Sequence, residues 1–171
     1  MISAKFLFPQ KFTWGTATSS HQVEGGHPDN NWTAWEKQPG RILENGMSNP
    51  GCDWWGGGRW REDLTRAAES GQNAHRFSIE WARIQPTPDS WDESAIDFYR
   101  GIMREMIERG LRPMVTLHHF TDPLWFTEQG GWLNPAAPAL FRRYVEKIVP
   151  ALKELICQRS EERRVGKECR S

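Results

Sequence analysis

The spacing of apolar and polar residues predicts strands separated by helical and loop segments. At Ala74–Trp81 every second residue from Phe77 onward is apolar, which is the alternation of a strand. Shorter apolar runs predict two further strands, at Phe12–Ala17 and Arg112–Leu117. Each of these runs is bounded by turn-forming or polar residues, as strands of a compact domain usually are.

Apolar residues at helical spacing predict three helices. The first covers Arg59–Ser70 and ends at Gly71, a residue that suits the left-handed position after a helix. The second begins at the N-cap residue Asp92 and ends at Gly110. The third begins at Asn134-Pro135, an N-cap followed by a proline, and continues to about Leu155.

Three consecutive strand–helix units predict parallel strands joined by right-handed crossovers. A doubly wound sheet and a (β/α)8 barrel both fit this pattern. No glycine-rich phosphate fingerprint follows any predicted strand, which disfavours nucleotide binding. Polar residues at the strand ends favour the barrel. The fold class is therefore α/β, with about three of the βα units of a TIM barrel.

A long segment, Thr18–Gly58, separates the first strand from the first helix and is rich in glycine, asparagine and proline. Long irregular segments inside compact domains are usually functional or disordered. This one contains Trp32, Trp35, Trp54 and Trp55, so we expect a packed functional loop.

The segment Pro113–Trp125, PMVTLHHFTDPLW, places two histidines, a phenylalanine, an aspartate and a tryptophan after a strand. Aromatic faces and hydrogen-bonding side chains together are typical of sugar pockets. A metal site is the rival interpretation of the histidine pair. Adjacent strand residues point to opposite faces, so His118 and His119 are poorly placed to bind one ion. We expect neither a metal nor another cofactor.

Charge and composition exclude some classes of function. The 22 basic and 22 acidic residues give a net charge of zero, with no basic stripe for nucleic acid and no apolar run long enough for a membrane. The 10 tryptophans fit either core packing or stacking platforms. The first residues lack a long apolar run, and the three cysteines lack metal-type spacing, so we expect a cytoplasmic protein.

Three motifs resemble those of the family-1 glycoside hydrolases, the β-glucosidase family. They are FTWGTATSSHQVEGG (Phe12–Gly26), NAHRFSIEWARIQP (Asn73–Pro86) and PMVTLHHFTDPLWF (Pro113–Phe126), in the order and at the separations of that family. The resemblance covers about Phe6 to Leu155. It implies the N-terminal portion of a TIM barrel and a retaining hydrolase that acts on terminal β-D-glycosides.

The resemblance also implies roles for individual residues. Gln22 matches the glutamine that binds two hydroxyls of the sugar in the non-reducing-end subsite, although a loop-stabilising amide is the alternative. His119 matches a histidine that binds the same sugar, whereas His118 is expected to pack. Phe120 is expected to be either a wall of this subsite or an ordinary core residue. Arg76 matches the arginine beneath the catalytic nucleophile, and a carboxylate partner is expected for it.

The acidic residues of the chain receive other roles. Glu80 is expected to form a structural ion pair or to lie at the surface, and Glu24 to be structural. Glu36 and Glu128 are expected to be solvated.

Neither catalytic glutamate of the family lies in this chain. The family mechanism needs an acid and a nucleophile about 5–5.5 Å apart. In the family the acid belongs to an Asn-Glu-Pro motif, which is missing here, and the nucleophile to a Glu-Asn-Gly motif at a later strand. Glu44-Asn45-Gly46 spells that tripeptide, but it lies in the first long segment and is expected to be a turn. The chain is therefore expected to be inactive alone. The alternative is a non-catalytic carbohydrate-binding or vestigial product.

The end of the chain differs from the rest. We expect a partial glycosidase domain at 1–158 and an artefactual tail at 159–171, because RSEERRVGKECRS resembles a translated sequencing adapter. A natural, solvated helical end is the other interpretation. The oligomeric state stays open. So does the choice among glucosides, galactosides, fucosides and 6-phospho-glycosides.

Overall fold

The computed structural model of the chain describes residues 7–26, 29–45 and 54–161. Three strands, β1 (Gly15–Ala17), β2 (Ala74–Ser78) and β3 (Arg112–Thr116), form a parallel sheet in the order β1-β2-β3. Gly15 pairs with Ala74, and Ala74 pairs with Arg112. The predicted parallel arrangement is confirmed.

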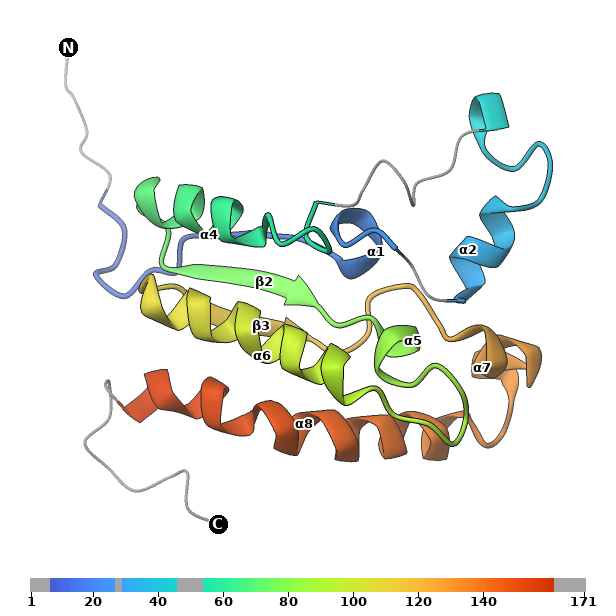
Figure 1. The fold of residues 1–171 in the computed structure, drawn as a ribbon. Coiled ribbons are helices and arrows are strands. Elements are labelled where there is room, and N and C mark those ends of the chain that lie inside the picture. Colours follow the sequence, from blue (N-terminus) through green and yellow to red (C-terminus); the bar gives the residue numbers. More distant parts are fainter. Residues whose placement is uncertain (1–6, 27–28, 46–53, 162–171) are drawn as a thin grey trace.

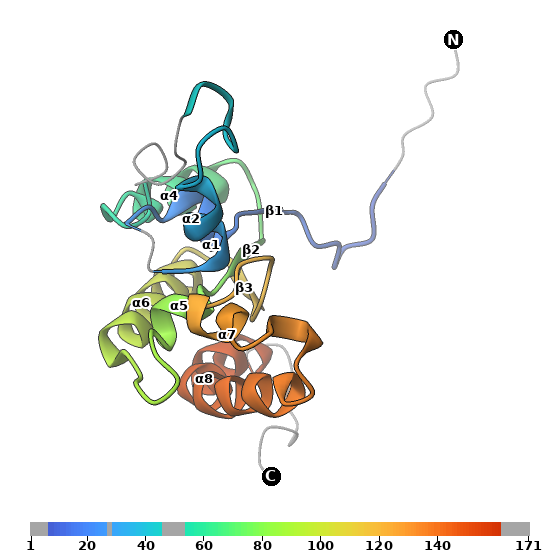
Figure 2. The same ribbon diagram turned by 90° about the vertical axis from the view of Figure 1, so that its right-hand side faces the viewer.

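A long helix lies between β1 and β2, a second between β2 and β3, and a third after β3, as in successive βα units. These helices are α4 (Trp60–Glu69), α6 (Glu93–Glu108) and α8 (Ala137–Glu161), and Figure 1 shows them running alongside the strands. Figure 2 shows α4, α6 and α8 curving around one side of the strands. The architecture is α/β and forms part of a (β/α)8 barrel, as predicted.

The core lies between the sheet and these helices. Trp81, just after the end of β2, is fully buried, stacked on Tyr144 at 5.1 Å between ring centroids and tilted against Phe126 at 4.9 Å. The apolar positions that gave the three helical patterns are buried as expected, except Ala68 and Phe141, which are only partly buried. The buried positions comprise Leu64 and Ala67 of α4, Ile96, Tyr99, Met103 and Met106 of α6, and Tyr144, Ile148 and Leu152 of α8.

Local capping signals place two of the helix boundaries correctly. The Asp92 carboxylate accepts a hydrogen bond from the Ala95 amide at 3.1 Å and so caps α6. Gly71 after α4 has a φ of 82°, the left-handed conformation that favours glycine. The third helix begins later than predicted, at Ala137, because the Asn134 side chain accepts from the Ala136 amide within a turn. It also continues beyond Leu155, to Glu161.

The segment predicted as a long loop contains regular structure that the sequence reasoning missed. Its elements are α1 (Ser20–Val23), α2 (Asn31–Glu36) and the 3-10 turn η1 (Leu43–Asn45). A capping box begins α2: Asn30 accepts from the Thr33 amide at 2.8 Å, and Thr33 Oγ1 accepts from the Asn30 amide at 3.0 Å. Gly46 of the predicted turn, Cys52, Cys169 and tail residues 162–171 lie outside the described residues.

Strand β2 is shorter than predicted because its last residues turn into a helix. The Ile79 amide still bonds to Thr116 O at 3.0 Å, but the Glu80 amide bonds to the Tyr99 hydroxyl at 2.9 Å instead of continuing the sheet. Helix α5 (Trp81–Ile84) begins directly afterwards. Two further elements follow β3, namely α7 (Leu124–Glu128) and the 3-10 turn η2 (Gly131–Leu133).

The sheet face opposite the long helices is open. The register places Ala17, Arg76 and Met114 side by side on this face. Met114 is 45% exposed, Ala17 is exposed and Arg76 is half-buried. Among the described residues no helix is both long and apolar enough to cross a membrane.

Candidate functional site

The three parallel strands all end at the same edge of the sheet, where α1, α5 and the segment after β3 begin (Figure 1). Gln22 lies in α1, two residues beyond Ser20, and its side chain is exposed. Its carbonyl oxygen accepts a hydrogen bond from the Ser19 hydroxyl at 2.6 Å. Within the described residues, its amide NH2 has no hydrogen-bond partner.

The segment after β3 brings the other two predicted sugar-binding residues together. The exposed His119 ring lies 5.1 Å from the half-buried ring of Phe120. Phe120 also contacts residues of the segment after β1, with its centroid 5.8 Å from His21 and 5.2 Å from Trp32. Phe120 therefore joins the two strand-end segments that contain Gln22 and His119.

Arg76 lies on the open face of the sheet, beside Ala17 and Met114. In the part of the chain that the structure describes, its guanidinium makes no hydrogen bond or ion pair. The carboxylate partner expected for Arg76 is therefore not among these residues, and its role beneath a nucleophile stays a prediction.

His118 does more than pack. Its Nε2 lies 2.9 Å from Asp122 Oδ1, and the Trp132 indole N–H contacts both oxygens of the same carboxylate at 3.0 and 3.1 Å. The described residues contain no group of three histidine, cysteine or acidic side chains that could hold a metal ion.

A buried polar network lies directly beneath these residues, and the sequence reasoning missed it. Glu80 is 0% exposed, and its Oε2 accepts hydrogen bonds from Ser20 Oγ at 3.0 Å and Thr121 Oγ1 at 2.8 Å. Glu80 is neither at the surface nor, within the described residues, part of an ion pair, so the expectation of a surface position or an ion pair is wrong. The available signal was the run of polar residues Arg76, Ser78 and Glu80 on one face of a strand.

Glu24 extends the network toward α5 and α6, and its expected structural role is confirmed. Its Oε2 accepts from the Tyr99 hydroxyl at 3.0 Å and lies 3.2 Å from Arg83 Nε. Burial raises the pKa of Glu24 to about 8 even though Arg83 opposes this shift.

Glu36 is buried rather than solvated, which contradicts the expectation for this residue. Its Oε1 lies 3.3 Å from His21 Nε2, and the two side chains are 2% and 5% exposed. The reason is tertiary, because the fold brings His21 of α1 and Glu36 of α2 into contact and buries both side chains. Glu128, the other residue expected to be solvated, is exposed at the end of α7.

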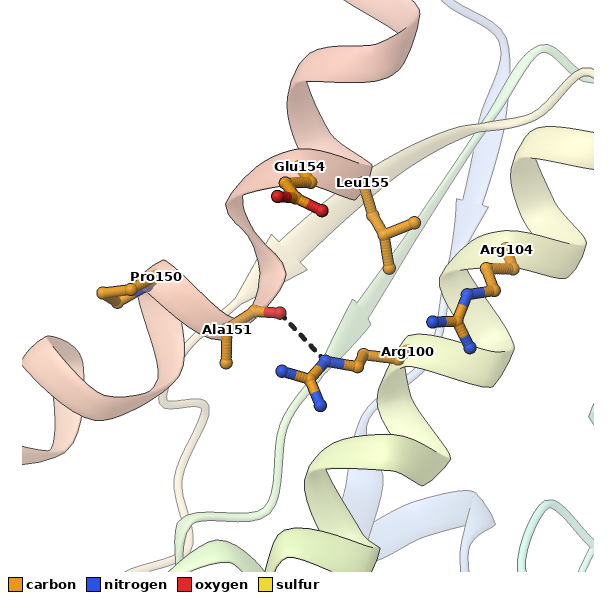
Figure 3. Close-up of a pocket in the computed structure, with 6 residues that line it drawn as sticks. All are labelled: Arg100, Arg104, Pro150, Ala151, Glu154 and Leu155. Atoms are coloured by element: carbon orange, nitrogen blue, oxygen red, sulfur yellow. Dashed lines mark hydrogen bonds between the residues drawn. The ribbon is translucent and has the colours of Figure 1, made fainter. Parts of the chain in front are cut away.

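A separate hollow of about 360 Å3 lies between α6 and α8 (Figure 3). Arg100 Nε donates to Ala151 O at 3.0 Å across it, and Arg104 and Glu154 also line it. It lies in the helix layer, away from the strand ends that contain Gln22 and His119.

Three parallel strands that end at one edge of a sheet, with long helices on one face and the other face open, are the arrangement of part of a (β/α)8 barrel. The family model of glycosyl hydrolase family 1 matches residues 4–158, and the chain belongs to this family. This confirms the resemblance found in the sequence.

Similar proteins include both curated sequences and solved structures. The chain is 31% identical to β-glucosidase A of Acetivibrio thermocellus, an alignment that covers 90% of this chain and 35% of the relative. It is 33% identical to the human cytosolic β-glucosidase, over 81% of this chain and 31% of the relative. The solved family 1 β-glucosidase of Thermotoga maritima superposes with a TM-score of 0.81 at 31% identity, over 87% of this chain and 34% of that one. The chain thus spans about a third of the length of these relatives.

Proposed function

We propose that this chain forms the non-reducing-end sugar subsite of a β-glucosidase-type retaining glycoside hydrolase that acts on terminal β-D-glycosides. The observation that supports this most directly is the placement of Gln22, His119 and Phe120. They come from two strand-end segments that touch through Phe120, and both polar side chains are exposed. The names of the β-glucosidase relatives give the substrate class.

The chemistry of the three side chains suits a pyranose ring. The carboxamide of Gln22 offers donors at its free NH2 end and can bridge neighbouring hydroxyls. The imidazole of His119 can bind one more hydroxyl. The ring of Phe120 forms a half-buried wall beside them, and aromatic faces pack on the C–H face of sugars.

Arg76 has a different role in this proposal. Its guanidinium occupies the open face without a carboxylate partner among the described residues. In the complete barrel it would bind the nucleophilic carboxylate from a later strand, hold it in position and keep it ionised through charge-assisted hydrogen bonds.

The chain does not catalyse hydrolysis alone in this proposal. Glu24, Glu80 and Asp122, acidic residues that follow the three strands, are 1%, 0% and 8% exposed, so none of them is placed to reach a glycosidic oxygen. Both catalytic carboxylates therefore come from outside this chain. A cytoplasmic location belongs to the same proposal and is supported by the name of the human relative.

A hybrid enzyme tests the proposal. Residues 4–158 replace the matching third of the Thermotoga maritima β-glucosidase, and hydrolysis of 4-nitrophenyl β-glucoside is measured for the hybrid and for the 171-residue chain. We expect the hybrid to hydrolyse the substrate and the isolated chain to be inactive. Activity of the isolated chain, or a folded hybrid without activity, would contradict the proposal.

Two substitutions in the hybrid test the individual roles. Gln22→Leu should lower kcat/KM by roughly 100-fold, because the bound sugar would lose the hydrogen bonds of the carboxamide to its hydroxyls. The matched control is Gln129→Leu, an exposed glutamine after α7, which should leave kcat/KM unchanged. Arg76→Met should mainly lower kcat and shift the acid limb of the pH profile, whereas the exposed Arg104→Met should do neither.

A further inference from the structure

We infer that Glu80 is a positioning residue of the sugar subsite, because its carboxylate holds the segment after β1 in register with the segment after β3. The effect of Glu80 on sugar binding rests on the proposed function. The connection it makes between the two segments does not, and can be tested by itself. Nothing in the family resemblance gives Glu80 this role.

One oxygen atom makes the connection. Glu80 Oε2 accepts the Ser20 hydroxyl at 3.0 Å and the Thr121 hydroxyl at 2.8 Å, from residues 60 and 41 positions away along the chain. Ser20 lies two residues before Gln22, and Thr121 directly follows Phe120 and lies two residues after His119. The carboxylate thus joins the two segments that contain Gln22, His119 and Phe120.

All the groups in this connection are buried. Ser20 is 3% exposed, Glu80 0% and Thr121 4%. Both hydroxyls donate to a carboxyl oxygen that is shielded from solvent, so water does not compete for these hydrogen bonds. If the carboxylate were lost, two buried hydroxyls would lose their acceptor at once.

Glu80 is itself held in place from two directions. Its backbone amide donates to the Tyr99 hydroxyl on α6 at 2.9 Å. Ser78, two residues earlier on β2, accepts from the Ser20 amide at 2.8 Å and donates to Ser20 Oγ at 3.2 Å. The position of the carboxylate is therefore tied to β2 and α6, whose apolar side chains belong to the buried core.

Only one of the two oxygens of Glu80 makes the connection, so glutamine is a conservative replacement for this residue. Glu80 Oε1 is buried and has no hydrogen-bond partner among the described residues. Glutamine at this position keeps an acceptor oxygen for both hydroxyls, whereas leucine keeps only the volume. Glu80→Gln should therefore retain the connection that Glu80→Leu loses.

Hydrogen exchange of the full 171-residue chain tests the structural part. The amides of Ser20, Gln22 and Asp122 are hydrogen-bonded in the structure, so their exchange reports on the two segments. Glu80→Leu should accelerate exchange in 19–22 and 117–122 together, by roughly tenfold or more, as expected for the loss of two buried hydrogen bonds. Glu80→Gln should stay close to the unsubstituted chain. Acceleration in one segment only, or in neither, would overturn the inference.

Kinetics of the hybrid enzyme test the consequence for the subsite. Glu80→Leu and Thr121→Val should lower kcat/KM for the nitrophenyl glucoside by roughly 10- to 100-fold, because small displacements of binding groups are costly. For monodeoxy glucosides that lack a hydroxyl bound by Gln22 or His119, this loss of kcat/KM should be smaller. Glu80→Gln should keep the activity of the unsubstituted hybrid. Equal losses on all substrates would indicate a purely structural role and contradict the inference.

The matched control is Thr127→Val, which removes an exposed hydroxyl on α7 that reaches only Pro123 O at 3.4 Å. It should change neither exchange nor kinetics. A folded hybrid that is inactive before any substitution would refute the proposed function, while the exchange experiment would still decide the role of Glu80.

Discussion

Replacing Glu24 by glutamine should remove a specific part of the pH dependence of stability. Glu24 is 1% exposed, and its pKa is raised from 4.5 to about 8, first by burial and second by the nearby Glu80 carboxylate, against the opposing charge of Arg83. Glu24→Gln keeps an oxygen that can accept the Tyr99 hydrogen bond but has no proton to lose.

The sign follows from the direction of the shift. The folded state binds the Glu24 proton more tightly than the unfolded state, so this stabilisation is complete below pH 4.5 and is lost as the pH rises toward 8. One proton corresponds to a slope of about 1.4 kcal/mol per pH unit, and the whole interval to about 4–5 kcal/mol. Glu24→Gln should therefore lose less stability than the unsubstituted chain over this range.

Urea unfolding followed by tryptophan fluorescence, at several pH values from 4 to 9, measures the effect. The quantity to compare is the difference in free energy of unfolding between the two proteins at each pH. Buried His75, whose pKa is lowered mainly by desolvation, contributes with the opposite sign, but it is present in both proteins and cancels. Parallel stability curves would refute the argument, because they would mean that the pKa of Glu24 is the same in the folded and unfolded states.

Three further substitutions should lower the free energy of unfolding measured by the same urea method. Tyr99→Phe should cost about 2–3 kcal/mol, because it keeps the buried ring but removes a hydroxyl that bridges a backbone amide and a carboxylate; a loss below 0.5 kcal/mol would contradict this. Gly15→Ala should cost about 1–3 kcal/mol, because the added Cβ would lie 2.5 Å from Ala74 O, and unchanged stability would show that β1 can move away. Asp122→Ala should cost about 1–2 kcal/mol by leaving the Trp132 indole N–H unpaired, whereas an unaffected midpoint would show that water replaces the carboxylate.

Local signals in the sequence predicted most of the regular structure. The alternation at Ala74–Trp81 gave β2, and the capping residues Asp92 and Gly71 placed helix ends within a residue or two. These features depend on neighbouring residues only, so they are visible without the fold. The parallel order of the strands followed from the repeated strand–helix units.

The candidate site was only partly accessible from the sequence. The motifs identified Gln22, Arg76, His119 and Phe120, and the structure adds that Phe120 contacts His21 across two strand-end segments. The sequence reasoning missed the capping box of α2, since its short Asn-x-x-Thr signal lies within a segment dominated by loop-forming residues.

Sequence alone thus determined the βα units, the family and the residues expected to contact a sugar. Only the tertiary structure decided which acidic side chains are buried. Glu80, Glu24 and Glu36 look alike in the sequence, yet each is enclosed by groups from distant segments, such as Ser20 at 60 residues from Glu80 and Tyr99 at 75 residues from Glu24. Burial and pKa depend on what packs around a group in space, and such contacts leave no local periodicity in the chain.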